Sequence, residues 1–207
     1  MTLTDSNARE HALRREADEL LARYGLLDLL KQFGRPHVSG SYSLHVMTWR
    51  DLDIYLEMQP VDKRCFLDLG RQLGDVLGPR KLSFTDYLNF PATEPVKGLY
   101  WGIQTDVLSR GGWKIDLWGV SPEECAARLD HCSGLAARIG SREREIILTI
   151  KNDVCRHPHY RDTITSQHVY DSVLSGGATT TAEFWRWLGD DSSPRDDARS
   201  TPRRRES

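Results

Sequence analysis

Residues 50–58 read Arg-Asp-Leu-Asp-Ile-Tyr-Leu-Glu-Met, in which polar and apolar side chains alternate strictly. Alternation with a period of two predicts a β-strand with one face buried. Asp51, Asp53 and Tyr55 then project to one side of the strand, and the apolar residues between them to the other. Two residues along a strand are separated by ~6.6 Å, so the two carboxylates are close enough to share a metal site.

A third acid is expected beside these two. Residues 98–107 and 112–120 flank the segment Leu108-Ser109-Arg110-Gly111, which predicts a β-hairpin with a glycine-containing turn. Asp116 is a single acid on the second of these strands, on the face opposite Ile115 and Leu117. If this strand pairs with residues 50–58, three acids converge and repel one another unless a cation lies among them. Carboxylate oxygens suit magnesium or manganese.

An Asp-x-Asp pair on an amphipathic strand is also common on a solvated face, so the acids alone leave both interpretations open. The segment upstream, Val38-Ser39-Gly40-Ser41-Tyr42, favours a binding site. Gly40 has no side chain where the backbone would approach a ligand, and Ser41 offers a hydroxyl and an amide. Together they can hold a phosphate oxygen.

Gly40-Ser41, the acid-hydrophobic-acid-hydrophobic run Asp51-Leu52-Asp53-Ile54, and Asp116 on a later strand occur in the order and spacing of a known pattern. In this the sequence resembles the nucleotidyltransferase-fold superfamily, which includes polymerase β, poly(A) polymerases and antibiotic adenylyltransferases. The resemblance covers roughly residues 36–118. It implies an α+β fold, with a small mixed sheet flanked by helices and an all-helical C-terminal region.

The resemblance also implies roles for these residues. Asp51 and Asp53 would hold two magnesium ions, and Asp116 would complete the metal site and help to deprotonate the acceptor hydroxyl. Gly40 and Ser41 would anchor the β- and γ-phosphates. Lys151 is a further nucleotide-binding candidate within an apolar helical run. Two orientations are open for it, a reach toward the triphosphate or an outward-pointing ammonium group, and the second is favoured.

The expected activity is transfer of a nucleoside monophosphate from an NTP, ATP in the first place, to a hydroxyl on a small molecule. Two alternatives stay open: a protein-modifying adenylyltransferase of the toxin–antitoxin type, and a nucleotide-binding module without catalysis. Nucleic acid is disfavoured as a partner because the net charge is −2 and no basic face interleaved with aromatic residues is apparent.

Three regions are expected along the chain. Residues 1–120 form the nucleotidyltransferase domain, which begins with a helix over residues 6–33 that Gly25 interrupts, and has a second helix within 61–78. Residues 121–189 form a helical domain, with helices predicted at 122–138, 141–156, 166–175 and 180–188. Residues 190–207 are rich in Asp, Ser, Pro and Arg and are expected to be a disordered tail.

Composition places the protein among soluble globular chains. Its 207 residues are 39% hydrophobic and 28% charged, and the mean hydropathy is −0.53. No apolar run approaches the ~20 residues of a membrane-spanning helix, and residues 1–20 lack the apolar core of a signal peptide. The four cysteines form no Cys-x-x-Cys pair. The expected location is the cytoplasm, without a membrane partner.

Overall fold

The computed structural model describes residues 3–90, 96–160 and 163–189, and the tail predicted at 190–207 lies outside the described residues. The helices are α1 Leu3–Asp18, α2 Leu26–Leu30, α3 Gly40–Ser43, α4 Lys63–Leu77, α5 Pro122–Arg138, α6 Ser141–Val154, α7 Ser166–Leu174 and α8 Thr181–Leu188. The strands are β1 Arg35–Ser39, β2 Asp51–Glu57, β3 Lys81–Asp86, β4 Leu99–Thr105 and β5 Trp113–Val120.

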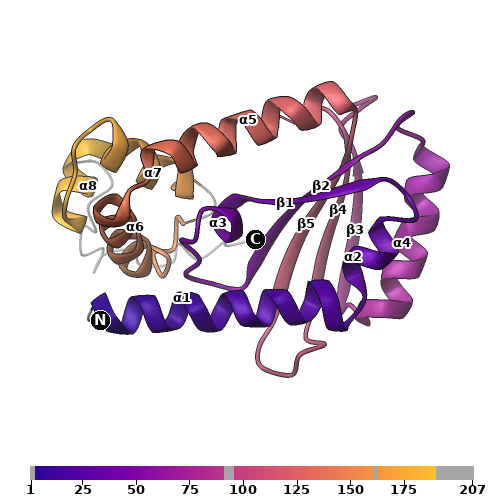
Figure 1. Ribbon diagram of the computed structural model, residues 1–207, viewed down its shortest axis with the longest axis horizontal. Helices are drawn as coiled ribbons and strands as arrows, with labels where there is room; N and C mark the ends of the chain where they lie inside the picture. Colours follow the sequence, from indigo (N-terminus) through magenta and orange to yellow (C-terminus); the bar gives the residue numbers. More distant parts are fainter. Residues whose placement is uncertain (1–2, 91–95, 161–162, 190–207) are drawn as a thin grey trace, which may run out of the picture.

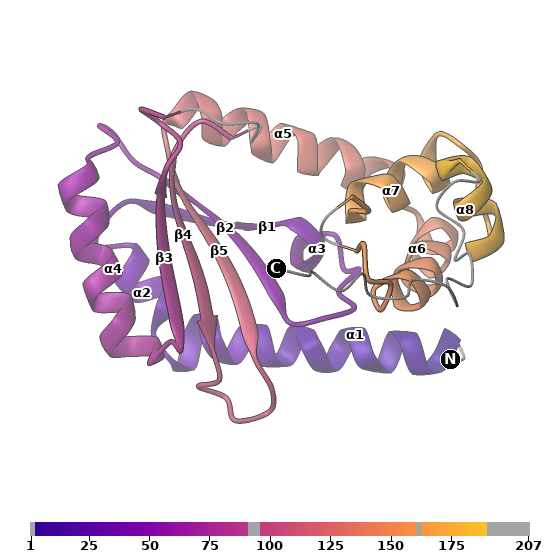
Figure 2. The ribbon, with the colours of Figure 1, turned by 180° about the vertical axis from the view of Figure 1, so that it is seen from behind.

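The five strands form one mixed sheet in the order β1-β2-β5-β4-β3. β2 and β5 are parallel, and every other neighbouring pair is antiparallel. The β4–β5 pair confirms the predicted hairpin. Helices surround the sheet and gather at the C-terminal end of the chain, as Figures 1 and 2 show from opposite sides. The predicted α+β class with a small mixed sheet is confirmed.

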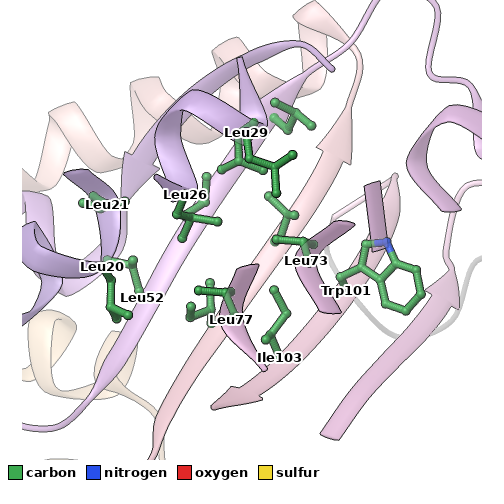
Figure 3. Close-up of a cluster of buried hydrophobic side chains, with 14 of the residues drawn as sticks. Leu20, Leu21, Leu26, Leu29, Leu52, Leu73, Leu77, Trp101 and Ile103 are labelled. Carbon is green, nitrogen blue, oxygen red and sulfur yellow. The ribbon is translucent and has the colours of Figure 1, made fainter. Parts of the chain in front are cut away.

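One face of the sheet carries the main hydrophobic core. Leu52 of β2 and Ile103 of β4 are fully buried, and so are Leu73 and Leu77 of α4. Figure 3 shows these side chains meeting those of Leu20, Leu21, Leu26 and Leu29, which come from the segment after α1 and from α2. Burial of each large aliphatic side chain contributes about 1.5–3 kcal/mol. This face therefore holds the sheet rigid behind the opposite, polar face.

The first helical region is interrupted as expected at Gly25, which has φ +71°. A π-helical turn, Glu19–Arg23, connects α1 to this residue. The structure also contains β1, to which the sequence pattern assigned no strand. β1 includes Pro36, which lacks an amide donor, and it lies at the edge of the sheet, where proline is tolerated.

The helices from residue 122 onward begin as predicted. The Ser121 hydroxyl accepts a hydrogen bond from the Glu124 amide at 3.3 Å, and Pro122 occupies the first turn of α5. Helices α6, α7 and α8 build a second hydrophobic cluster, which also takes in Leu44 and Val46 from the segment between α3 and β2. We propose that residue 120 separates the two domains along the sequence. The segment between α3 and β2 is an exception, because it belongs to the first domain in sequence but packs against the helices of the second.

Among the described residues, no helix combines the length and the apolar character required to cross a membrane.

Candidate active site

The polar face of the sheet brings the three predicted acids together. Asp53 and Asp116 are register partners on the parallel strands β2 and β5. One carboxylate oxygen from each of Asp51, Asp53 and Asp116 lies within 4.8 Å of the others. The period-two pattern places all three on the same face because each strand keeps its apolar residues in the core. The convergence expected from strand pairing is therefore present.

Two neighbours partly compensate the negative charge. The ammonium group of Lys114 forms an ion pair with Asp116 and lies 3.6 Å from Oδ1 of Asp51. The Tyr100 hydroxyl donates a hydrogen bond of 2.5 Å to Oδ1 of Asp116. Burial opposes the charge on Lys114, but the nearby carboxylates outweigh it and raise its pKa above the ordinary value. One lysine facing three acids leaves the cluster net negative.

Burial raises the pKa of Asp51, and the Asp53 carboxylate raises it further. Burial and then the Asp116 carboxylate raise the pKa of Asp53 in the same way. Oδ1 of Asp51 is buried and has no hydrogen-bond donor among the described residues. A buried oxygen in this condition is costly, and a divalent cation would satisfy it. The cluster of hard oxygen ligands therefore fits magnesium.

Gly40 lies against the acid cluster. Its φ is +63°, and a Cβ atom at this position would lie 2.0 Å from Oδ2 of Asp53. Only glycine combines this backbone conformation with such a close approach. Ser41 follows at the start of α3 and is buried. The Ser43 hydroxyl donates a hydrogen bond of 2.7 Å to the Val38 carbonyl and so holds the turn closed.

A cavity of about 740 Å³ opens over the acids and lies between the sheet and the α7 region. This volume falls within the range of small-molecule sites. The α7 side contributes aromatic and hydroxyl groups. The lining residues are Gly40, Ser41, Trp49, Asp51, Asp53, Gln104, Lys114, Asp116, Tyr160, Thr165, Ser166, Gln167 and Tyr170. The predicted Gly-Ser pair and the three acids thus share one cavity with residues of the helical C-terminal region.

Lys151 points inward, so the favoured outward orientation is wrong. Its side chain is fully buried. The ammonium group donates hydrogen bonds to the Val46 carbonyl at 2.8 Å and to the Tyr170 hydroxyl at 3.2 Å. Burial lowers its pKa to about 8, although Asp51 and Asp53 act in the opposite direction. Lys151 therefore lies behind Tyr170, which does line the cavity. Its contact with a nucleotide stays a prediction.

Sequence reasoning did not single out several residues of the site. Tyr100 and Gln104 had a usable signal, because they alternate with the apolar residues of β4 and so share the face of Asp116. Lys114 has the same signal on β5. Residues of the helical region had no such signal, since only tertiary packing brings them over the sheet; they are Tyr160, Thr165, Ser166, Gln167 and Tyr170.

No family model matches the sequence, and no curated protein matches it either. Solved structures do match in three dimensions. The chain is similar to a cytoplasmic RNA terminal U-transferase, with 16% identity and a TM-score of 0.53 over 78% of this chain and 45% of the other. It is also similar to the Cid1 poly(U) polymerase with magnesium and 3′-dATP bound, with 16% identity and a TM-score of 0.55 over 78% and 48%.

A second structure of Cid1, a mutant bound to MgATP, gives 14% identity and a TM-score of 0.56 over 79% of this chain and 50% of that one. The chain thus spans about half the length of these proteins. At this level of identity the likeness concerns the fold alone. The protein therefore has the nucleotidyltransferase fold.

Proposed function

We propose that the protein transfers a nucleoside monophosphate from an NTP to a hydroxyl group and releases pyrophosphate. The observation that carries the proposal is the convergence of Asp51, Asp53 and Asp116 within 4.8 Å, beside a glycine turn and inside one cavity. Such a cluster is unfavourable in an empty protein, and it becomes favourable when divalent cations and a triphosphate share the cavity.

The donor is oriented by Gly40 and Ser41. Because Gly40 leaves no side chain beside Asp53, the β- and γ-phosphates can approach the carboxylates closely at this turn. The aromatic residues of the α7 side, Tyr160 and Tyr170, lie across the cavity and offer ring surfaces for the base. This arrangement sets the α-phosphate over the acids. We propose ATP as the donor.

The reaction requires one proton transfer and one displacement. Asp116 accepts the proton of the acceptor hydroxyl, while Tyr100 and Lys114 hold this carboxylate in place. The acceptor oxygen then forms a bond to the α-phosphorus. The bond between the α-phosphorus and the bridging oxygen breaks, and its electron pair leaves with pyrophosphate.

Asp51, Asp53 and Asp116 are the residues that would hold magnesium, with manganese as a substitute. Bound there, the metal supplies charge neutralisation for the triphosphate and for the oxygen that leaves. We place the reaction in the cytoplasm, on a small-molecule acceptor. All four cysteines are free thiols, which suits a reducing compartment.

Burial and neighbouring carboxylates raise the pKa values of Asp51 and Asp53. The ionised acids therefore oppose the stability of the metal-free fold, a cost that is typical of active sites. A third carboxylate, Asp116, supplies the proton acceptor that transfer requires and that nucleotide binding alone does not.

The test incubates the purified protein with each of the four α-labelled NTPs, magnesium and a cell extract. We expect label to appear on a small molecule and pyrophosphate to be released. Asp53→Asn serves as the matched control, since it keeps the shape of the side chain and removes one charge. Label on a protein would support the protein-modifying alternative. Absence of label from every fraction, with nucleotide binding intact, would leave the binding module.

A further inference from the structure

A second cavity adjoins the one that contains the acids. It has a volume of about 330 Å³ and shares Trp49, Gln104 and Lys114 with its neighbour. Its other lining residues come from α1, from the segments that precede β2, β3 and β5, and from the first residue of β5. They are Arg9, Leu13, Arg50, Arg80, Gly112 and Trp113. We call it the arginine cavity. Figures 1 and 2 show α1 passing the β4–β5 hairpin turn, at the end of the sheet where this cavity lies.

The arginine cavity is lined by four cationic side chains, Arg9, Arg50, Arg80 and Lys114, and no carboxylate of the described residues lines it. Three of them are paired with carboxylates outside the lining: Arg50 with Glu16, Arg80 with Asp106, and Lys114 with Asp51 and Asp116. Arg50 is held by two hydrogen bonds to Glu16, at 2.7 and 3.0 Å. Arg9 donates to the Thr48 carbonyl at 3.0 Å, which fixes its Nε atom. Arginine side chains oriented in this way are suited to phosphate oxygens.

Arg80 is the most loosely held of the three arginines. Its nearest carboxylate, on Asp106, is 3.9 Å away, and both side chains are more than half exposed. An exposed pair at this distance contributes little to stability. Arg80 can therefore turn toward an anion at small cost, whereas Arg50 is already committed to Glu16.

The position of the cavity relative to the donor decides what it can bind. In a phosphoryl transfer the attacking oxygen and the leaving oxygen lie roughly in line with the phosphorus. Gly40 and Ser41 follow β1, at one edge of the sheet, and Arg80 precedes β3, at the other. If the leaving pyrophosphate is held at Gly40, the acceptor must approach from the β5–β4 side. The arginine cavity lies on that side.

Resting on the proposed function, we infer that the arginine cavity binds a phosphate group carried by the acceptor. Lys114 lines the cavity and is two residues from Asp116, a separation of ~6.6 Å along the strand. One sugar-phosphate unit bridges such a spacing, with its hydroxyl at Asp116 and its phosphate among the arginines. The acceptor is then a phosphorylated compound, either a free nucleotide or the end of an oligonucleotide. The small net charge of the whole chain, −2, does not report this local positive site.

The experiment measures binding separately from transfer. The donor site is first filled with α,β-methylene-ATP and magnesium. Three probes that lack the reactive hydroxyl are then titrated: 3′-deoxyadenosine, its 5′-monophosphate, and a hexaribonucleotide with a 3′-deoxy end. We expect at least one phosphorylated probe to bind about tenfold or more tightly than the uncharged nucleoside, which corresponds to about 1.4 kcal/mol. The phosphorylated probe that binds more tightly shows whether the acceptor is a free nucleotide or the end of an oligonucleotide.

In the double variant Arg9→Gln, Arg80→Gln, the affinity for the phosphorylated probe should fall to the affinity for the uncharged nucleoside. The two substitutions should leave the dissociation constant of α,β-methylene-ATP within twofold of the wild-type value. The control is Arg71→Gln, an exposed arginine of α4 that pairs with Asp68 and Asp75 and lines neither cavity. Equal binding of the nucleoside and the phosphorylated probes would overturn the inference. So would an equal loss of donor and acceptor affinity in the double variant.

The failure of the proposed function would look different. If the wild-type protein binds the phosphorylated probe but transfers no label from any NTP, the proposed transfer activity is wrong and the phosphate site in the arginine cavity is supported. If it transfers label equally well to uncharged acceptors, the transfer activity is supported and the phosphate site is wrong.

Discussion

The two faces of β2 differ sharply in their relation to stability. Leu52, Ile54 and Leu56 are fully buried against the helices of the main core, and their burial stabilises the fold. Asp51 and Asp53 alternate with them, yet they lie among other carboxylates and their pKa values are raised. One strand of seven residues thus has a buried apolar face that stabilises the fold and a face of clustered acids that destabilises it. The apolar face holds the acids in a position that they would not adopt by themselves.

The largest effect is expected on the apolar face. Ile54→Ala should lower the free energy of unfolding by about 2–5 kcal/mol, because the lost methyl groups leave a cavity between the sheet and the helices. Urea denaturation followed by fluorescence measures the change. The control is Leu67→Ala, since Leu67 of α4 is 41% exposed and should contribute little. If Ile54→Ala also abolished transfer by the fraction that remains folded, the two faces would not be independent.

A smaller effect is expected at the turn beside the acids. Gly40→Val should weaken NTP binding tenfold or more, about 1.4 kcal/mol, because the new side chain would collide with the Asp53 carboxylate. Titration of the folded variant with α,β-methylene-ATP measures the affinity.

Gly78→Val is the matched control for this turn. Gly78 also has a positive φ, +47°, but a Cβ atom there meets nothing within 4 Å. Both variants share the backbone strain, and only the first fills the space beside the acids. Equal NTP affinity in the Gly40 variant and the wild type would remove the turn from the donor site.

How far the sequence predicts this structure depends on the range of the interactions. The positions of Asp53 and Asp116 on the polar faces of their strands could be predicted, because each strand has its own period-two pattern. The interruption of the first helical region was predicted from the single glycine in the helical pattern, and Gly25 has φ +71°. Both predictions rest on residues that are close together in the sequence. The pairing of the two strands, which brings Asp53 beside Asp116, is a long-range contact that the sequence pattern left as a condition.

The features that could not be predicted depend on tertiary packing. Lys151 follows an apolar run, which indicates a buried helix but not where a long side chain in it finds its partners. Only the fold brings the Val46 carbonyl and Tyr170 to its ammonium group. The arginine cavity has the same origin, since Arg9, Arg50 and Arg80 come from three separate segments. Neither spacing nor composition indicates such a convergence.

A substitution on the acid face should raise the stability of the fold, whereas a substitution on the apolar face lowers it. Asp53→Asn should raise the stability of the metal-free protein by on the order of 1 kcal/mol, because it removes one of three repelling charges. The same change should abolish transfer. It should also reduce the stabilisation by magnesium and NTP, which is about 2.7 kcal/mol in the wild type at a ligand concentration a hundred times the dissociation constant. Thermal melts with and without ligand measure both quantities.

The stability that Asp53→Asn gains over the metal-free wild type should increase with pH. In the folded protein the pKa of Asp53 is raised to about 6, above the value of ~3.9 for an unfolded chain. The folded state then binds the proton more tightly, so the wild type loses stability as pH rises through this interval. The advantage of Asn should vanish toward pH 4, appear as pH rises through 6, and become full only near pH 8, because the Asp53 carboxylate also helps to raise the pKa of Asp51 to about 8. The control is Asp75→Asn, because the Asp75 side chain is exposed on the outer surface of α4. A gain that is equal at pH 4 and pH 8 would contradict the charge repulsion.

The smallest effect is expected at Lys151, at the junction of the acid face and the helical region. Lys151→Met removes the donor to the Val46 carbonyl but also relieves the burial of a charge, so stability should change by less than about 1 kcal/mol. If Lys151 acts through Tyr170, the Michaelis constant for NTP should rise only about threefold, roughly 0.7 kcal/mol. Tyr170→Phe should then have an equal effect, and the double variant should add nothing to it. A tenfold rise in Lys151→Met alone, with Tyr170→Phe unchanged, would instead mean that the ammonium group contacts the triphosphate directly, the less favoured of the two orientations considered from the sequence.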